Sequence, residues 1–107
     1  MAKYLDAVSA AADGYTIEHD QRGHRFTINH EDRVLGEAHY SLRTDGSIDF
    51  DHTLVDPSLR GTGLSGVLAQ LALSDDVAQG RTIHASCWFI AGYLEKHPEL
   101  RGSSAAQ

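Results

Sequence analysis

A glycine-rich turn separates a strand-like segment from a helix-like one, and its residue types favour the binding of a phosphate group. The turn reads Arg60-Gly61-Thr62-Gly63-Leu64-Ser65-Gly66. Glycines let the main chain come close to phosphate oxygens and take positive φ angles. The first amides of a helix have no partner within the helix, and the helix dipole favours an anion there. Because Ser65 adds a hydroxyl and Arg60 a guanidinium, the sequence predicts a diphosphate site at this turn.

Two nucleotide-binding motifs share features with this turn, and each departs from it. A mononucleotide P-loop ends in Gly-Lys-Ser/Thr, but the turn contains no lysine. Gly61, Gly63 and Gly66 match the dinucleotide string, yet that motif needs a parallel sheet and an acidic residue about 20 positions further on. Gly80 and Arg81 stand at that place instead. A turn that merely begins a helix is the structural alternative.

The single cysteine, Cys87, follows a predicted strand and precedes a predicted helix. A helix N-terminus favours the reactive thiolate form of cysteine, which makes Cys87 a candidate catalytic residue. The alternative is a small buried side chain, since free cysteine is among the most buried residue types. Because one cysteine allows no disulfide within the chain, the sequence favours a reducing compartment.

His52 is a candidate for acid–base chemistry, since histidine titrates near neutral pH and can accept a proton from an amine. It shares a predicted strand face with the apolar residues Ile48, Phe50 and Leu54. A core histidine is the alternative, and a bulge in the strand would change its face. Asp49 and Asp51 are expected on the opposite, solvated face. The seven histidines show no paired metal-ligand spacing, so no metal site is predicted.

The helices and strands that position these residues are predicted from the spacing of their apolar residues. Alternation predicts three strands, one containing Phe26 and Ile28 and the others at 34–42 and 48–55. Polar residues between them predict turns, so the strands form an antiparallel meander. A helical stripe follows the glycine-rich turn and consists of Leu64, Val67, Leu68 and Leu71.

The sequence of the second half of the chain predicts a strand–helix–strand crossover. The helix is expected to end near Gly80, and a short strand is expected at 82–86. A strand, helix and strand in this order form a right-handed connection with a parallel pair. A last helix is predicted from Trp88 to Lys96, where Pro98 ends it.

Length and charge limit the function classes. The 107 residues allow one domain, and 15 acidic against 9 basic residues give a formal charge of −6. Nucleic-acid binding is not expected because it needs a basic surface, whereas a negative field attracts cationic amines. No apolar run approaches the roughly 20 residues that span a bilayer, and the N-terminus does not resemble a signal peptide. We therefore expect a cytoplasmic protein without nucleic-acid or membrane partners.

Three stretches of the chain resemble the minimal single-domain GNAT-like N-acetyltransferases of the YjdJ type. They are His52-Thr53-Leu54-Val55, Arg60-Gly61-Thr62-Gly63-Leu64, and Ser86-Cys87 with Tyr93 and His97-Pro98-Glu99 downstream. Ser65 stands where the GNAT acetyl-CoA motif usually has glycine or alanine. Ala85 stands where the small family usually has proline. The resemblance covers about residues 24–100.

The resemblance implies an α+β fold, with an antiparallel β-meander followed by α-β-α and a parallel strand pair that forms a V-shaped cleft. Acetyl-CoA would lie in this cleft, with its pyrophosphate on the turn from Arg60 to Gly66. The main chain near Leu54 and Val55 would orient its pantetheine and thioester. In larger relatives a tyrosine on the last helix protonates the departing thiolate, and Tyr93 is the matching residue. A core tyrosine is the alternative.

The implied function is transfer of an acetyl group from acetyl-CoA to a small-molecule or protein amine, by a domain at 15–101. Cys87, Tyr93 and His52 are the candidate catalytic residues. Residues 1–14 are expected to be an extension with a frayed helix, and 102–107 a flexible tail. A second interpretation is a module that binds acetyl-CoA or CoA with weak or no catalysis. A third, a nucleotide-binding βαβ fragment, predicts affinity for NAD or ATP.

Overall fold

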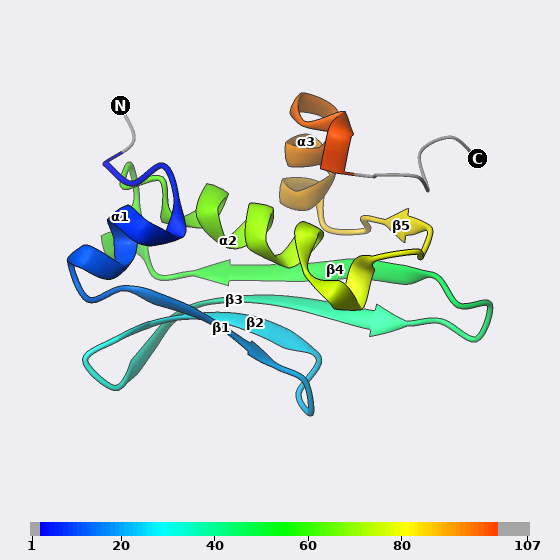
Figure 1. The fold of residues 1–107 in the computed structure, drawn as a ribbon, viewed down its shortest axis with the longest axis horizontal. Helices are drawn as coiled ribbons and strands as arrows, with labels where there is room; N and C mark the ends of the chain where they lie inside the picture. The colour runs from blue at the N-terminus through cyan, green and yellow to red at the C-terminus, as the bar shows by residue number, and fades with distance from the viewer. Residues whose placement is uncertain (1–2, 101–107) are drawn as a thin grey trace.

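A five-stranded sheet carries three helices on one of its faces (Figure 1). The computed structural model describes residues 3–100, so the tail expected at 102–107 lies outside the described residues. The strands are β1 (Thr16–Asp20), β2 (Arg25–His30), β3 (Arg33–Leu42), β4 (Ile48–Val55) and β5 (Ile83–His84). The helices are α1 (Ala7–Ala12), α2 (Leu64–Ser74) and α3 (Trp88–Lys96), with 3-10 turns η1 (Pro57–Leu59) and η2 (Asp76–Ala78). The predicted α+β architecture is confirmed.

The sheet has the strand order β1-β2-β3-β4-β5, and only the last pair is parallel. Within this pair Ile48 lies opposite Ile83 and Asp49 opposite His84. β4 then continues to Val55, beyond the end of β5. No strand among residues 3–100 pairs with this outer part of β4 on the β5 side. The predicted opening beside a parallel pair is therefore present.

β1 is an element that the sequence did not predict. It pairs with β2 in antiparallel register and forms one edge of the sheet. Ile17 is the one aliphatic residue in the strand, and it is half-buried between the exposed residues Thr16 and Glu18. With so little apolar alternation, the strand is recognisable only from its partner.

A bulge in β4 decides which side chains face the helices. Asp51 has no partner in β3, and the register of the two strands shifts there. An extra residue reverses the alternation of side chains beyond it. His52 and Leu54 are therefore exposed, whereas Thr53 and Val55 are half-buried on the side of α2 and α3. The predicted packing of His52 on the buried face of the strand is wrong.

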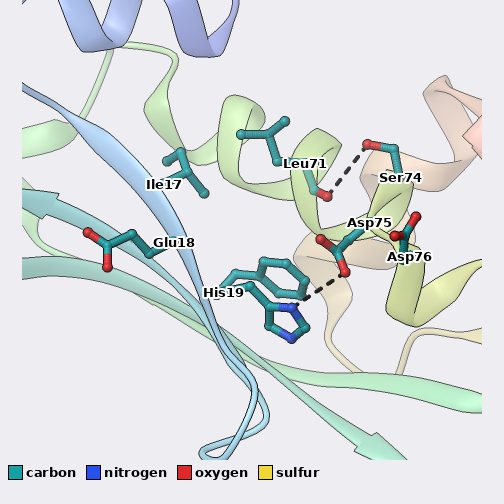
Figure 2. Close-up of a pocket in the computed structure, with 8 residues that line it drawn as sticks. Ile17, Glu18, His19, Leu71, Ser74, Asp75 and Asp76 are labelled. Atoms are coloured by element: carbon teal, nitrogen blue, oxygen red, sulfur yellow. Dashed lines mark hydrogen bonds and ion pairs between the residues drawn. The ribbon is translucent and has the colours of Figure 1, made fainter.

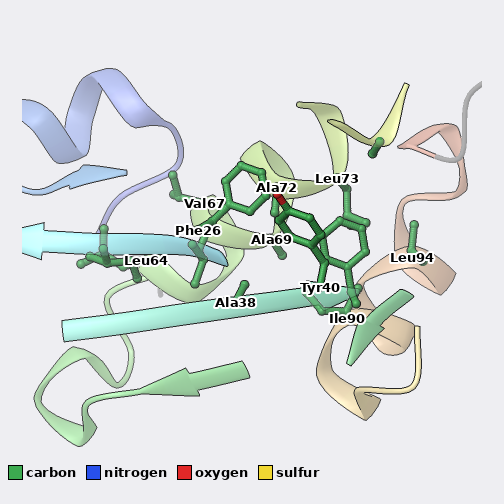
Figure 3. Packing of buried hydrophobic residues seen from close by; sticks show 14 of the residues in the cluster. Phe26, Ala38, Tyr40, Leu64, Val67, Ala69, Ala72, Leu73, Ile90 and Leu94 are labelled. Atoms are coloured by element: carbon green, nitrogen blue, oxygen red, sulfur yellow. The ribbon is translucent and has the colours of Figure 1, made fainter. Parts of the chain in front are cut away.

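The core lies between the sheet and the two longer helices (Figure 3). Phe26, Ala38 and Tyr40 contribute from the sheet, and Ile90 and Leu94 from α3. The predicted stripe of α2 is confirmed, because Leu64, Val67 and Leu68 are buried and Leu71 is half-buried. Within residues 3–100, no helix is both long and apolar enough to cross a membrane.

The end of α2 differs from the prediction. The helix ends at Ser74, well before Gly80. The side chain of Asp75 accepts a hydrogen bond from the N–H of Val77 at 3.0 Å, which begins the η2 turn. Aspartate competes with helical hydrogen bonds in this way, so it ends helices. The predicted strand at 82–86 is likewise shorter, whereas α3 has the predicted bounds.

The N-terminal segment contains the expected helix, but the segment is not peripheral. Asp6 and Ser9 form a capping box at the start of α1. Tyr4 and Ala10 are buried in the main core. Gly14 follows the helix with a φ angle of 87°, which glycine adopts readily. The segment is therefore packed against the domain through its aromatic and alanine side chains.

Candidate functional site

A groove with a volume of about 340 Å³ runs beside the outer part of β4. Thr53 and Val55 form one wall, and Cys87, Trp88 and Phe89 at the start of α3 form the other. Because β5 ends at its second residue, the N-terminus of α3 occupies the place that a longer strand would fill. We call this feature the β4–α3 groove.

Thr62 fixes the glycine-rich turn at the end of the β4–α3 groove. Its main-chain N–H and its hydroxyl both donate to the carbonyl oxygen of Leu59, at 3.1 Å and 2.6 Å. The same hydroxyl accepts the N–H of Leu64 at 3.2 Å. A single side chain thus closes the turn and caps the first amide of α2.

The remaining amides of the turn are unpaired. The N–H groups of Gly61, Gly63, Ser65 and Gly66 have no hydrogen-bond acceptor among residues 3–100. Gly61 and Gly63 have φ angles of 77° and 87°, in the region that glycine adopts without strain. Unpaired amides at a helix N-terminus are a typical anion site. The turn therefore has the donor groups that the diphosphate prediction requires.

Arg60 and Ser65 flank these amides, and both side chains line the groove. Arg60 is exposed, and its guanidinium forms no ion pair within residues 3–100. A free guanidinium beside unpaired amides suits a phosphate, because it donates several hydrogen bonds in one plane. Leu64, by contrast, is fully buried and serves the core.

Cys87 lies in the α3 wall of the groove. Its thiol donates to the hydroxyl oxygen of Thr53 at 3.3 Å, and its main-chain N–H donates to the carbonyl of Phe50 at 3.0 Å. The residue is the N-cap of α3 and is half-buried. The predicted position at a strand-to-helix junction is confirmed. Thr53, which the sequence did not single out, is its direct partner, and only the bulge brings it there.

Tyr93 lies beside α2 rather than along the groove walls. Its ring stacks on His97, with centroids 4.4 Å apart. A Cβ atom at Gly66 would lie 3.7 Å from the Tyr93 ring, an ordinary van der Waals distance, so the ring lies next to the first turn of α2. Burial, with a smaller effect of Glu99, raises the pKa of Tyr93, so its hydroxyl keeps its proton at neutral pH.

His52 lies on the opposite face of β4 from the groove. Its ring is 5.9 Å from that of His39, measured between centroids. His39 Nε2 lies 2.9 Å from the Glu37 carboxylate. Hydrogen bonding with Arg25 lowers the pKa of Glu37, so this carboxylate is charged at neutral pH. The structure thus places His52 beside a polar network and apart from the groove wall.

Leu54 also points away from the groove, with 59% of its surface exposed. The N–H of Asp56 pairs with the carbonyl of Leu35 at 2.8 Å. Alternate residues of an antiparallel ladder direct their main-chain groups to the same neighbour, so Leu54 faces β3. The main-chain groups of Thr53 and Val55 consequently face the groove. The main-chain contact with the cofactor that was expected from Leu54 would therefore come from Thr53.

Asp49 is a functional candidate that sequence reasoning placed wrongly. It is 6% exposed rather than solvated. Its carboxylate accepts the N–H and the hydroxyl of Ser86 at 2.9 Å and 2.7 Å, and a hydrogen bond from Arg43 at 3.1 Å. Arg43 lies six residues before Asp49, but Ser86 lies 37 positions away, so no local pattern predicts the pairing that buries the carboxylate.

A second pocket, of about 370 Å³, lies between β1 and the end of α2 (Figure 2). Its histidine, His19, has both ring nitrogens engaged. Nδ1 lies 3.4 Å from the Asp75 carboxylate, and Nε2 lies 2.7 Å from the Tyr40 hydroxyl. Because both ring nitrogens face protein groups, His19 links β1 with β3 and with the end of α2.

A sheet whose parallel pair separates beside a helix with unpaired N-terminal amides is an α+β domain with an open groove at that edge. The sequence at residues 25–102 matches the family described as GCN5-related N-acetyl-transferase, and the chain belongs to that family. It is similar to "Protein NATD1" of Homo sapiens, with 33% identity over 77% of this chain and 74% of the relative. The proteins of the same name from Gallus gallus and Danio rerio are 31% and 28% identical, each over 77% of this chain and 76% of the relative.

Proposed function

We propose that this chain is an acetyl-CoA-dependent N-acetyltransferase that acts on an amine. The observation that carries the proposal is the set of unpaired amides of Gly61, Gly63 and Ser65, at the end of a groove that leads to Cys87. Membership of the acetyltransferase family supports the same chemistry. The acceptor is a small-molecule or protein amine, in keeping with the negative charge of the chain.

The proposed binding roles follow the groove from end to end. The amides of Gly61, Gly63, Ser65 and Gly66 and the guanidinium of Arg60 hold the pyrophosphate. Thr62 and Leu64 keep the turn in shape, the first by hydrogen bonds and the second by packing. The main chain of Val55, together with Thr53, orients the pantetheine, with Leu54 directed to the neighbouring strand.

The proposed chemistry is direct transfer. Bound acetyl-CoA supplies a thioester, whose carbonyl carbon forms a bond to the amine nitrogen as the carbon–sulfur bond breaks. The amine loses its proton to solvent in the groove; His52, the candidate base, lies on the opposite face of β4 and would take up that proton only after it has left the groove. Tyr93 carries a proton for the departing thiolate. Cys87 lines the reacting end of the groove, beside Thr53.

The alternative function is a module that binds CoA with weak or no turnover. One observation favours it specifically: two of the three candidate catalytic side chains, His52 and Tyr93, do not line the groove. Such a module would use the same amides and the same guanidinium. It would bind acetyl-CoA and CoA without releasing thiol when amines are added.

Trp88 provides a direct test of binding. It is the single tryptophan, it lines the groove, and it is 84% exposed. Titration with CoA or acetyl-CoA should therefore change its fluorescence and raise the melting temperature. NAD and ATP serve as comparison ligands, and a response to either without a response to CoA would contradict the proposal. Thiol release with acetyl-CoA and a panel of amines then separates an enzyme from a module.

A further inference from the structure

Asp49 is the one charged residue that is buried among residues 3–100. It stands on β4 directly before Phe50, at the point where β5 ends. A buried carboxylate is costly unless hydrogen bonds satisfy its oxygens. Oδ1 accepts the Ser86 amide, and Oδ2 accepts both the Ser86 hydroxyl and Arg43. The position is thus specified by two partners from different parts of the chain.

The two bonds to Ser86 continue the sheet beyond its last ladder pair. Ser86 donates to the side chain of Asp49, and Cys87, the next residue, donates its N–H to the carbonyl of Phe50. Two successive residues of the connection to α3 are therefore attached to two successive residues of β4. Beyond this attachment β4 and α3 separate, and the groove lies between them.

We infer that Asp49 is a positioning residue of the β4–α3 groove, whose carboxylate holds Ser86 and thereby fixes the Cys87 thiol beside Thr53. The effect on the thiol stands on geometry alone. The further effect on CoA binding rests on the proposed function. Asp49 itself does not line the groove, so it acts through Ser86 and Cys87.

The charge state of Asp49 agrees with this role. Burial raises the pKa of the Asp49 carboxyl, but hydrogen bonds from Ser86 and Arg43 outweigh burial and hold it below its usual value. The group is therefore ionised at neutral pH and accepts hydrogen bonds through both oxygens. An amide in its place would keep one acceptor and present a donor where Ser86 and Arg43 also donate.

The test compares Asp49→Asn with Asp51→Asn. Asp51 is a matched control because it lies on the same strand, is exposed, and accepts a hydroxyl from Ser41 at 2.6 Å. Cys87 is the only cysteine, so iodoacetamide labelling of the native protein reports on this thiol alone, and comparing the variants at a pH where the thiol is fully ionised isolates its exposure. We expect labelling about tenfold faster in Asp49→Asn and unchanged in Asp51→Asn, since the broken bonds are charge-assisted. We also expect CoA binding, followed by Trp88 fluorescence, to weaken about tenfold only in Asp49→Asn.

If Asp49 has a purely structural role, Asp49→Asn will lower the melting temperature. The labelling rate and CoA binding, measured well below that temperature, will then stay unchanged. Ser86→Ala provides a second and milder variant, because it removes one hydroxyl and leaves the Asp49 carboxylate bonded to the Ser86 amide and to Arg43. Its labelling rate should rise less, and the double variant should match Asp49→Asn because the changes share one interaction. Folded variants with labelling within about twofold of the wild type would overturn the inference. If the wild type binds no CoA, the proposed function fails, and the labelling rates still decide the role of Asp49.

Discussion

The main-chain N–H of Tyr4 donates a hydrogen bond to the carbonyl oxygen of Thr62, with a donor–acceptor distance of 2.8 Å. The bond joins the N-terminal segment to the glycine-rich turn. The Tyr4 ring is buried, and its hydroxyl donates to Asp13 at 2.6 Å, so this bond joins the two ends of α1. Thr62 consequently directs its amide, hydroxyl and carbonyl to the protein, while the glycine amides beside it stay unpaired.

Replacing the Tyr4 side chain should therefore disturb the turn as well as the core. We expect Tyr4→Ala to lower the free energy of unfolding by about 3 kcal/mol through loss of a buried ring. It should also weaken CoA binding at temperatures where the protein is folded. Leu5→Ala is the control, because Leu5 is 78% exposed and adjacent. Urea unfolding and Trp88 fluorescence titration measure the two effects, and equal behaviour of the variants would contradict the prediction.

Substituting two glycines that share one backbone conformation should distinguish an effect on stability from an effect on CoA binding. Gly61 and Gly46 have φ angles of 77° and 89°, and a Cβ atom at either would meet no other atom within 4 Å. Alanine at each position should lower the free energy of unfolding by about 1 kcal/mol, because the left-handed conformation disfavours a Cβ atom. Only Gly61→Ala should reduce CoA affinity, since Gly46 lies in the β3–β4 turn. Equal CoA affinity in the two variants would argue against a ligand at the turn.

The hydroxyl of Thr62 offers a test of how the turn keeps its shape. Thr62→Val preserves the shape of the side chain but removes the bonds to Leu59 and Leu64. We expect a loss of about 1 kcal/mol in the free energy of unfolding per lost hydrogen bond, together with weaker CoA binding. Thr62→Ser keeps the hydroxyl and should recover most of both properties. If valine and serine behave alike, the hydroxyl does not organise the turn.

Sequence patterns predicted the elements whose signals are local. The stripe of Leu64, Val67 and Leu68 identified α2, and Pro98 marked the end of α3. The glycine-rich turn and Cys87 were assigned to the right junctions for the same reason. These features depend on residues that are near neighbours in the chain.

The groove itself depends on contacts that local patterns do not encode. Asp51 contains no signal for a bulge, since neither glycine nor proline stands near it in β4. Without the bulge, Thr53 would face away from the groove and His52 toward it. Asp49 was expected in solvent because Ser86, which satisfies it, lies 37 positions away. Side-chain direction after a bulge and the partners of a buried charge follow only from strand register.

Alkaline pH should reveal the contribution of the Tyr4–Asp13 bond. The hydrogen bond with Asp13, followed by burial, raises the pKa of Tyr4 from 10.0 to about 12. A group whose pKa is higher in the folded state than in the unfolded state binds its proton more tightly when folded. Its contribution to stability is therefore fully present below pH 10 and is lost as the pH rises through about 12.

Tyr4→Phe keeps the ring and removes this titration. The difference in unfolding free energy between the wild type and Tyr4→Phe should be constant up to pH 10 and should shrink between pH 10 and about 12. Burial raises the pKa of Tyr40 and Tyr93 as well, but both residues are present in the two proteins, so their effects cancel. Urea unfolding at a series of pH values measures the difference. Repeating the comparison in an Asp13→Asn background should remove most of the pH dependence, because the Asp13 carboxylate is its main cause. A pH dependence that persists in this background would assign the effect to burial of the Tyr4 ring instead.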